Sequence, residues 1–232
     1  MKRIPVYLLV VLAACFLCLP AHAQSVTWNT DQMISVSTEN TTTPDVAVSG
    51  NRAVAVWAQE VDGYNRVFAS YSTNRGETWS SPQLIEDQYY RAQNPCVFLS
   101  GETVVVVWEQ STGTVYNVYS NYSTDGGETW QATASPHRLN TAGSFSAGET
   151  SAAMSGDNIV VVWAQLLDGS FNRIYANTST NAGVTWGTPV QISSTTSTIA
   201  KSPHVAISGG NAAAVWRSEE RRVGKECRSR GS

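Results

Sequence analysis

Three motifs recur in a fixed order along this chain of 232 residues, and they constrain the fold more than any other feature. An octapeptide of the form Ser-Thr-Asn/Asp-x-Gly-x-Thr-Trp occurs at 72–79, 123–130 and 179–186. Apolar runs that end in tryptophan occur at 54–57, 105–108, 160–163 and 213–216, and Ser-Gly pairs occur at 49–50, 100–101, 155–156 and 208–209. The tryptophans of these runs are 51, 55 and 53 residues apart. This spacing predicts a repeat protein with a unit of about 50 residues.

Each unit is predicted to contain four short strands. In the first unit we expect them at 45–49, 53–59, 67–72 and 78–85, with Asp62-Gly63 as the turn of a hairpin. Asp168-Gly169 has the same place in the third unit. No helical periodicity is found after the N-terminal apolar segment. Four-stranded antiparallel units at this period predict the blades of an all-β propeller, which share their cores by stacking around an axis.

The octapeptides resemble the Asp box of bacterial neuraminidase (BNR) repeats, which implies a sialidase-like β-propeller. We expect the third residue to bond a backbone N–H two residues on, the glycine to supply positive φ, and the tryptophan to open the fourth strand. Asn replaces Asp in two copies, which a structural turn tolerates and a catalytic carboxylate does not. We therefore assign a structural role to Ser72, Asn74, Gly76, Trp79, Ser123, Asp125, Gly127, Trp130, Ser179, Asn181, Gly183 and Trp186.

The chain is predicted to hold only part of a propeller. Segment 27–35 matches 185–193, so the mature chain is expected to open on a fourth strand. From 44 to 216 there is room for three blades plus two strands, so with the N-terminal strand the chain holds about three complete blades plus parts of two others, whereas the resemblance implies six in a full ring. We therefore interpret the chain as truncated, with the rest of its propeller missing.

Residues 1–23 have the pattern of a signal peptide. Lys2 and Arg3 precede an apolar run at 4–19, and Ala21-His22-Ala23 provides a cleavage site. The alternative is a lipoprotein box at 12–15 that would leave Cys15 lipidated. Both predict a secreted or periplasmic product, and neither provides a stable membrane span.

The C-terminal tail, 217–232, differs sharply in composition from the propeller region, 24–216. Nine of its sixteen residues are charged, and it resembles the translation of a sequencing-library adapter. We interpret it as non-native; the alternative is a basic patch for nucleic acid or a surface.

Composition restricts the function of the region 24–216. Seven Lys/Arg against fifteen Asp/Glu argue against a nucleic-acid partner. Cys96 is the only cysteine there, and His137 and His204 have no carboxylate at fixed spacing, so we predict no disulfide, no metal and no cofactor. Sequons begin at Asn40, Asn121 and Asn177.

Candidate ligand-binding residues are expected on the face opposite the octapeptides, where exposed aromatics can stack on sugars and arginines can bind carboxylates. Arg66 and Arg173 occupy equivalent positions, so the alternative for them is a charge pair with the Asp of their own hairpin. The alternative for the interblade loop at 86–91 is a solvated surface. The candidates are Asp62, Tyr64, Arg66, Glu86, Asp87, Tyr89, Tyr90, Arg91, Phe171 and Arg173, with Tyr116, Phe145, Glu149 and Asp168 nearby in the pattern.

Two main functions remain open, with a purely structural envelope role as a third. The first is a non-catalytic, extracytoplasmic propeller that binds glycans or surface proteins. The second is an exo-sialidase-like glycoside hydrolase whose catalytic residues lie mostly in a missing C-terminal half. The resemblance implies an arginine triad, a Tyr–Glu pair, an Asp acid and an Arg-Ile-Pro segment. Arg3-Ile4-Pro5 falls in the signal, and no residue here can be assigned to the triad, so the activity rests on analogy.

Overall fold

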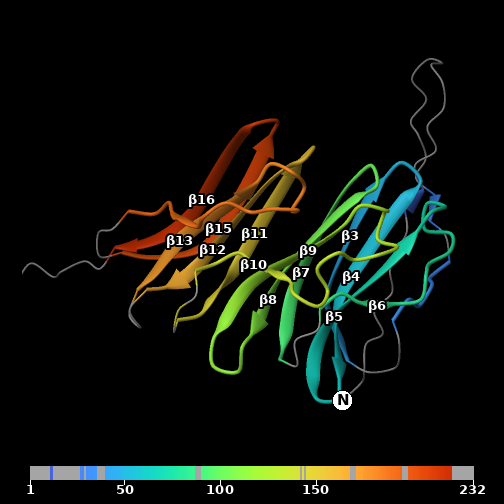
Figure 1. Ribbon diagram of the computed structural model, residues 1–232, viewed down its shortest axis with the longest axis horizontal. Helices are drawn as coiled ribbons and strands as arrows, with labels where there is room; N and C mark the ends of the chain where they lie inside the picture. Colours follow the sequence, from blue (N-terminus) through green and yellow to red (C-terminus); the bar gives the residue numbers. More distant parts are fainter. Residues whose placement is uncertain are drawn as a thin grey trace, which may run out of the picture.

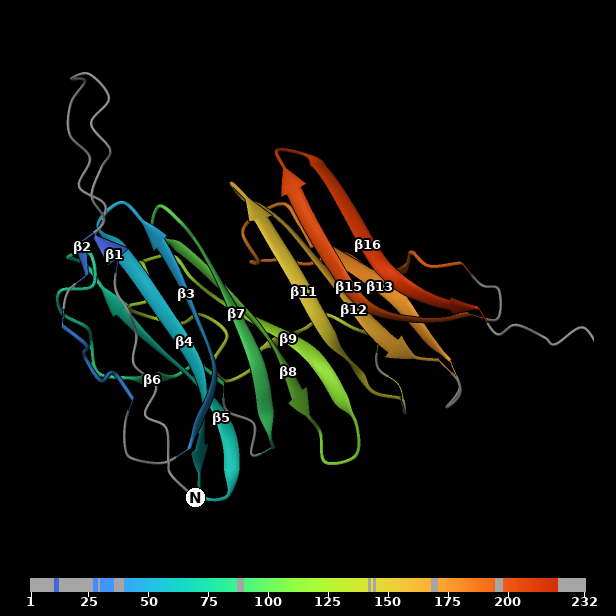
Figure 2. The same cartoon turned by 180° about the vertical axis from the view of Figure 1, so that it is seen from behind.

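The chain forms an all-β partial propeller, seen in a computed structural model that describes residues 11–12, 27–28, 30–35, 40–86, 90–141, 143, 145–167, 171–194 and 198–220. Blade 1 is the sheet β3-β4-β5-β6, blade 2 is β7-β8-β9-β10, and blade 3 is β11-β12-β13-β14, all antiparallel; β15-β16 begins blade 4 (Figures 1 and 2). The strands are β1 (Val11–Leu12), β2 (Thr27–Trp28), β3 (Thr41–Ser49), β4 (Arg52–Val61), β5 (Tyr64–Ser72), β6 (Gln83–Leu84), β7 (Ala92–Ser100), β8 (Thr103–Ser111), β9 (Tyr116–Ser123), β10 (His137–Arg138), β11 (Ala147–Ser155), β12 (Asn158–Leu166), β13 (Asn172–Ser179), β14 (Val190–Gln191), β15 (Thr198–Ser208) and β16 (Asn211–Glu220).

The predicted ends of the chain lie largely outside the described residues. Of 1–23 only β1 is described, and it pairs with β2. Of segment 27–35, which the sequence predicts to be a fourth strand, the described residues include a strand only at 27–28. Ile34 packs against the cluster of Ala55, Trp57 and Phe68 in blade 1. Of the predicted tail, 217–220 continue β16 and 221–232 are not described.

The second strand of each complete blade forms the core, because its apolar run is covered on both faces. Val104 to Trp108 of β8 are at most 1% exposed. Three tryptophans, Trp57, Trp108 and Trp163, stack on an aromatic residue of the third strand with ring centroids 6.2–6.3 Å apart. Each indole N–H donates to the glutamine two residues on, at 2.9–3.1 Å. The repeated Trp-x-Gln pattern therefore satisfies a buried donor in every complete blade.

The fourth strands are much shorter than predicted. β6, β10 and β14 have two residues each, and the octapeptide tryptophans precede them instead of opening them. After each tryptophan one backbone N–H, from Ser80, Gln131 or Gly187, bonds the third strand. Pro82, Pro136 and Pro189 follow, and each fourth strand begins at the next residue. Proline has no N–H to donate, so the ladder is interrupted at that point.

Each octapeptide forms the same tight turn. The serine Oγ accepts the glycine N–H four residues on, at 2.8–2.9 Å in all three copies. The third residue accepts the threonine N–H four residues on, at 2.8–2.9 Å, and not the N–H two residues on as predicted. Two consecutive residues with positive φ cause this difference. The expected glycines have φ of 80° to 94°, but Arg75, Gly126 and Ala182 before them also have φ of 54° to 78°.

Asp125 gives this turn in blade 2 a pH dependence that Asn74 and Asn181 do not provide. Burial raises the pKa of the Asp125 carboxyl, but hydrogen bonds from Ser123, Thr129 and the backbone outweigh burial and hold that pKa below its ordinary value of 3.8. A lowered folded-state pKa stabilises the fold above the unfolded pKa, and this contribution is lost as the pH falls through the folded pKa. We expect Asp125→Asn to be less stable than wild type at pH 7, with the difference shrinking once the pH falls below the ordinary carboxyl value of 3.8.

Urea unfolding at a series of pH values measures this effect. Asp62→Asn is the matched control, because Asp62 is exposed in a hairpin turn at φ 52°, a conformation that asparagine also adopts. A plot of unfolding free energy against pH for Asp62→Asn should run parallel to the plot for wild type. A constant difference between wild type and Asp125→Asn from pH 7 to pH 3 would contradict the assignment.

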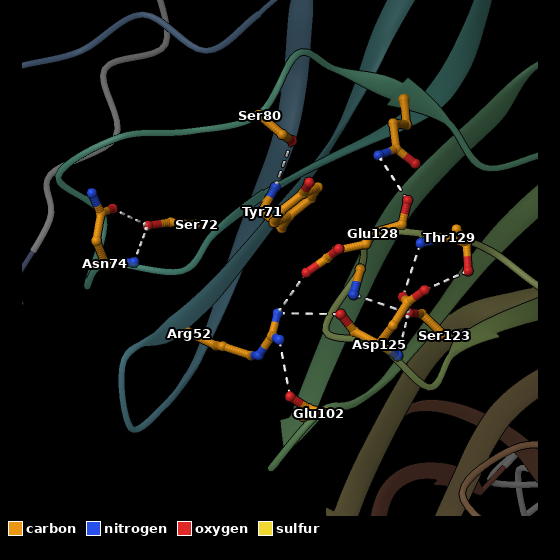
Figure 3. Close-up of polar contacts among 12 residues, drawn as sticks. Arg52, Tyr71, Ser72, Asn74, Ser80, Glu102, Ser123, Asp125, Glu128 and Thr129 are labelled. Atoms are coloured by element: carbon orange, nitrogen blue, oxygen red, sulfur yellow. Dashed lines mark hydrogen bonds and ion pairs between the residues drawn. The ribbon is translucent and has the colours of Figure 1, made fainter.

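Neighbouring blades are tied by polar side chains as well as by the shared core. Arg52 of β4 reaches blade 2, where it donates to Glu102 at 2.9 Å, Glu128 at 3.3 Å and the Asp125 carbonyl at 3.2 Å (Figure 3). A Cβ on Gly126 would lie 2.3 Å from the Arg52 guanidinium, so glycine leaves room for this contact. Gly101 and Gly209 donate their N–H to Ser49 and Ser155 of the preceding blade, so the Ser-Gly pairs link neighbouring blades at these two junctions.

Candidate functional site

A cleft of about 430 Å³ lies between blades 2 and 3, at the ends of the strands opposite the octapeptide turns. It is formed where β7, β9, β11 and β13 begin and where β8 and β12 end. The polar residues that line it are Gln93, Asn94, Glu109, Tyr116, Ser146, Glu149 and Asn172. The sequence predicts ligand binding on this face, but most of the predicted candidates lie elsewhere.

The cleft exists because the first strands of blades 2 and 3 separate. β3 runs beside β7 and β11 runs beside β15, whereas β7 and β11 meet only briefly (Figure 2). Asp45 accepts the N–H of Val97 in the next blade, and Ser151 accepts that of Val205. Register places Cys96 at the same position in blade 2. A thiol is a weak acceptor, so this link between first strands is lost in blade 2.

Cys96 is held in its thiol form. Burial, together with the charge of Asp45 and a hydrogen bond to it, raises the pKa of Cys96 to about 12. A group that stays protonated at neutral pH is a poor nucleophile and a poor metal ligand. Cys96 therefore packs as a small apolar side chain.

A bulge in each first strand directs side chains into the cleft. The register of strands one and two shifts in every blade, and a non-glycine residue with φ of 49° to 53° occupies each shift: Thr43, Asn94, Glu149 and Ser202. Such values are uncommon outside glycine, and they reorient the side chain relative to a regular strand. Asn94 and Glu149 both line the cleft as a result.

Glu109 joins the two sides of the cleft. This side chain is 3% exposed, and its Oε2 accepts from Gln93 Nε2 at 3.1 Å and from Asn94 Nδ2 at 3.2 Å. Its Oε1 accepts the backbone N–H of Thr150 in β11 at 3.0 Å. All three partners are donors, so both oxygens of this carboxyl group accept hydrogen bonds from the walls of the cleft. Glu109 therefore fixes the two sides of the cleft relative to each other.

Glu149 is the accessible carboxylate of the cleft. It is exposed, and its Oε2 accepts the N–H of Ser202 in blade 4 at 2.5 Å. The flanking residues, Gly148 and Thr150, both approach Glu109. One oxygen of Glu149 thus positions the side chain while the group stays open to solvent. On the other side Ser146 Oγ accepts the N–H of Tyr116 at 3.1 Å, which holds the tyrosine at the cleft.

Two of the predicted candidates, Arg66 and Glu86, lie away from the cleft and pair with each other. Arg66 donates to Glu86 through Nε at 2.5 Å, and Glu86 also accepts from Gln110 Nε2 at 2.8 Å. Glu86 is 0% exposed. The alternative pairing of Arg66 with Asp62 is wrong, because Asp62 is exposed in the hairpin turn. Arg66 and Glu86 link blade 1 to blade 2, and the geometry leaves neither open to a ligand.

The other predicted candidates are dispersed. Arg173 is buried, with its guanidinium 5.5 Å from the centre of the Phe171 ring. Tyr64, Tyr90 and Arg91 are exposed but do not line the cleft. Phe145 is partly exposed and also lies outside the lining residues. Asp87, Tyr89 and Asp168 fall outside the described residues.

Sequence reasoning identified Tyr116 and Glu149 but missed Gln93, Asn94, Glu109 and Asn172. A usable signal existed for Glu109. The residue after the core tryptophan is Ala58 in blade 1 and Ala164 in blade 3, so a carboxylate in the same place in blade 2 breaks the repeat inside a buried strand. No comparable signal distinguishes Asn172.

Within the described ranges, no three side chains of His, Cys, Asp or Glu gather closely enough to hold a metal ion. The same part of the chain contains no helix long and apolar enough to cross a membrane.

No protein-family model matches the chain, and no curated protein matches it. Solved structures do show the fold. An α-L-arabinanase of Penicillium chrysogenum, complexed with arabinobiose, is 16% identical with a TM-score of 0.51 over 71% of this chain and 53% of that chain. A GH93 α-L-arabinofuranosidase of Fusarium graminearum with arabinobiose is 12% identical with a TM-score of 0.55 over 84% of this chain and 63% of that one. The chain thus spans less than two thirds of the length of either structure.

Proposed function

We propose that this chain is part of an extracytoplasmic β-propeller that binds glycans in the cleft between blades 2 and 3. The observation that carries the proposal is the cleft itself. It combines one accessible carboxylate, Glu149, with amides and the ring of Tyr116, on the face opposite the octapeptides. Sugars are bound by such mixtures, because hydroxyls pair with amide and carboxylate groups while C–H faces rest on aromatic rings.

Three further observations support this reading. The octapeptides resemble Asp boxes, and each forms a hydrogen-bonded turn at the end of a third strand. The solved structures with the same fold are glycoside hydrolases, two of them holding arabinobiose. The N-terminal 23 residues have the signal pattern, which would bring the cleft into contact with extracellular glycans.

Binding is favoured over hydrolysis by the surroundings of Glu109. Most glycosidases use two carboxyl groups, one of which donates a proton. Glu109 is surrounded by donors and buried, which leaves Glu149 as the open carboxylate of the described cleft. Hydrolysis remains the second candidate because two carboxylates do lie on one cleft.

Glycan-array screening followed by calorimetry tests the proposal on the purified chain. We expect Tyr116→Ala and Asn172→Ala each to weaken binding tenfold or more, equivalent to about 1.4 kcal/mol. Tyr64→Ala is the matched control, because Tyr64 begins the third strand of blade 1 as Tyr116 does in blade 2, but it lies outside the cleft. Absence of glycan binding, or loss only with Tyr64→Ala, would refute the assignment. Turnover of fluorogenic glycosides would favour the hydrolase.

A further inference from the structure

We infer that the cleft selects neutral oligosaccharides and rejects sugars that carry a carboxylate, an inference that rests on the proposed function. The charged side chains that line the cleft are Glu109 and Glu149, and no Lys or Arg is among the lining residues of the described chain. A sialic or uronic acid placed there would bring a third negative charge close to the other two. Like charges at such a distance repel, the more so where side chains exclude water.

The orientation of the amides adds to this selectivity. Gln93 and Asn94 direct their N–H₂ groups at Glu109, at 3.1 Å and 3.2 Å. Their carbonyl oxygens are then the atoms left to meet a ligand, and Glu149 presents further acceptors. Sugar hydroxyls can donate to these oxygens. An ionised carboxylate has no proton to donate, so it meets acceptors that it cannot satisfy.

Among the described residues, no Lys or Arg forms an ion pair with Glu109 or Glu149. Arg66 is paired with Glu86 of blade 1, and Arg173 is buried against Phe171. Arg91 is exposed but outside the lining residues. Lys201 precedes the residue whose N–H binds Glu149, yet no ion pair joins Lys201 to that carboxylate in the described chain. Recognition of an anionic sugar by an arginine clamp, as the sialidase resemblance implies, therefore has no support at this cleft.

Paired ligands that differ only in charge test the inference. We expect oligogalacturonate to bind the full chain at least tenfold more weakly than its methyl ester, and sialyllactose at least tenfold more weakly than sialyllactose methyl ester. Raising the salt concentration to 1 M should narrow both differences, because salt screens the repulsion. Glu149→Gln keeps an oxygen for the Ser202 N–H, and it should reduce the ratio of neutral to acidic affinity about tenfold. Glu60→Gln on β4, outside the cleft, should leave the ratio unchanged.

The outcomes separate the two proposals. If acidic ligands bind as tightly as their neutral counterparts, or if Glu149→Gln leaves the ratio unchanged, the selectivity is refuted while glycan binding stands. If no ligand of either kind binds, or if binding is indifferent to Tyr116→Ala, the proposed function itself fails.

Discussion

Replacing Asn121 with alanine is expected to lower the free energy of unfolding by about 3–5 kcal/mol, because several backbone groups would lose their partners at once. Asn121 is 0% exposed in the middle of β9. Its Nδ2 donates across the blade boundary to the Ile85 carbonyl at 2.9 Å. Its Oδ1 accepts the N–H of Tyr122 at 2.7 Å and that of Ala132 at 2.9 Å. One side chain thus ties blade 1 to blade 2 and closes the loop before β10.

Urea unfolding followed by tryptophan fluorescence measures the loss. Asn177→Ala should behave similarly, because Asn177 repeats the tie one blade later through the Leu139 carbonyl at 3.0 Å. Asn40→Ala is the control, since Asn40 is exposed and its backbone carbonyl keeps its bond to Glu60; it should change stability by less than about 0.5 kcal/mol. An Asn121→Ala protein within about 1 kcal/mol of wild type would show that water replaces the amide.

A sequon does not show whether its asparagine is buried, as Asn40, Asn121 and Asn177 illustrate. All three begin sequons, and the sequence does not distinguish them. The structure buries Asn121 and Asn177 and exposes Asn40. The difference arises because positions 121 and 177 face the fourth strand of the preceding blade, a relation between segments 36 and 38 residues apart. A glycan on either buried amide is incompatible with the packed blades.

Features that repeat were predictable from the sequence, because every complete blade buries the same strand and makes the same turns. The buried second strands, the Asp62-Gly63 hairpin and the positive φ of Gly76 all follow from local patterns. The fourth strands were predicted too long because the prediction followed the apolar pattern alone. It did not take into account the proline before each fourth strand, which has no N–H to donate to the neighbouring strand. The bulges at Asn94 and Glu149 were missed because glutamate does not indicate positive φ, and asparagine, although enriched there, is also common at negative φ.

The cleft was largely hidden because it depends on departures from the repeat. Cys96 replaces the oxygen that links other first strands, and Glu109 replaces an alanine beside the core tryptophan. Neither residue alters the strand propensity or the spacing of the repeat, so the repeat pattern does not reveal either of them. Arg66 and Glu86 were noticed as charges, but their pairing across 20 residues depends on burial that a sequence pattern does not give.

Replacing Glu109 with alanine is expected to cost about 2–4 kcal/mol of unfolding free energy, because hydrogen bonds to a charged acceptor each contribute about 1.5–3 kcal/mol and water from the cleft recovers part of the loss. Gln93, Asn94 and the Thr150 N–H would all lose that acceptor. The Thr150 bond joins β8 to β11 where the first strands separate, so its loss should also loosen blade 3 against blade 2. Hydrogen exchange at the Thr150 amide measures that loosening directly.

Glu102→Ala is the matched control for Glu109→Ala, because both glutamates belong to blade 2 and only their surroundings differ. Glu102 is 66% exposed and pairs with Arg52 at 2.9 Å, so its removal should cost less than about 1 kcal/mol. The loss of unfolding free energy for Glu109→Gln should lie between those of the two alanine variants. Its remaining oxygen can still accept the Thr150 N–H, but its new N–H₂ group faces the N–H₂ groups of Gln93 and Asn94 and cannot accept from them. Equal losses for Glu102→Ala and Glu109→Ala, with unchanged exchange at Thr150, would mean that the buried carboxylate does not hold the cleft together.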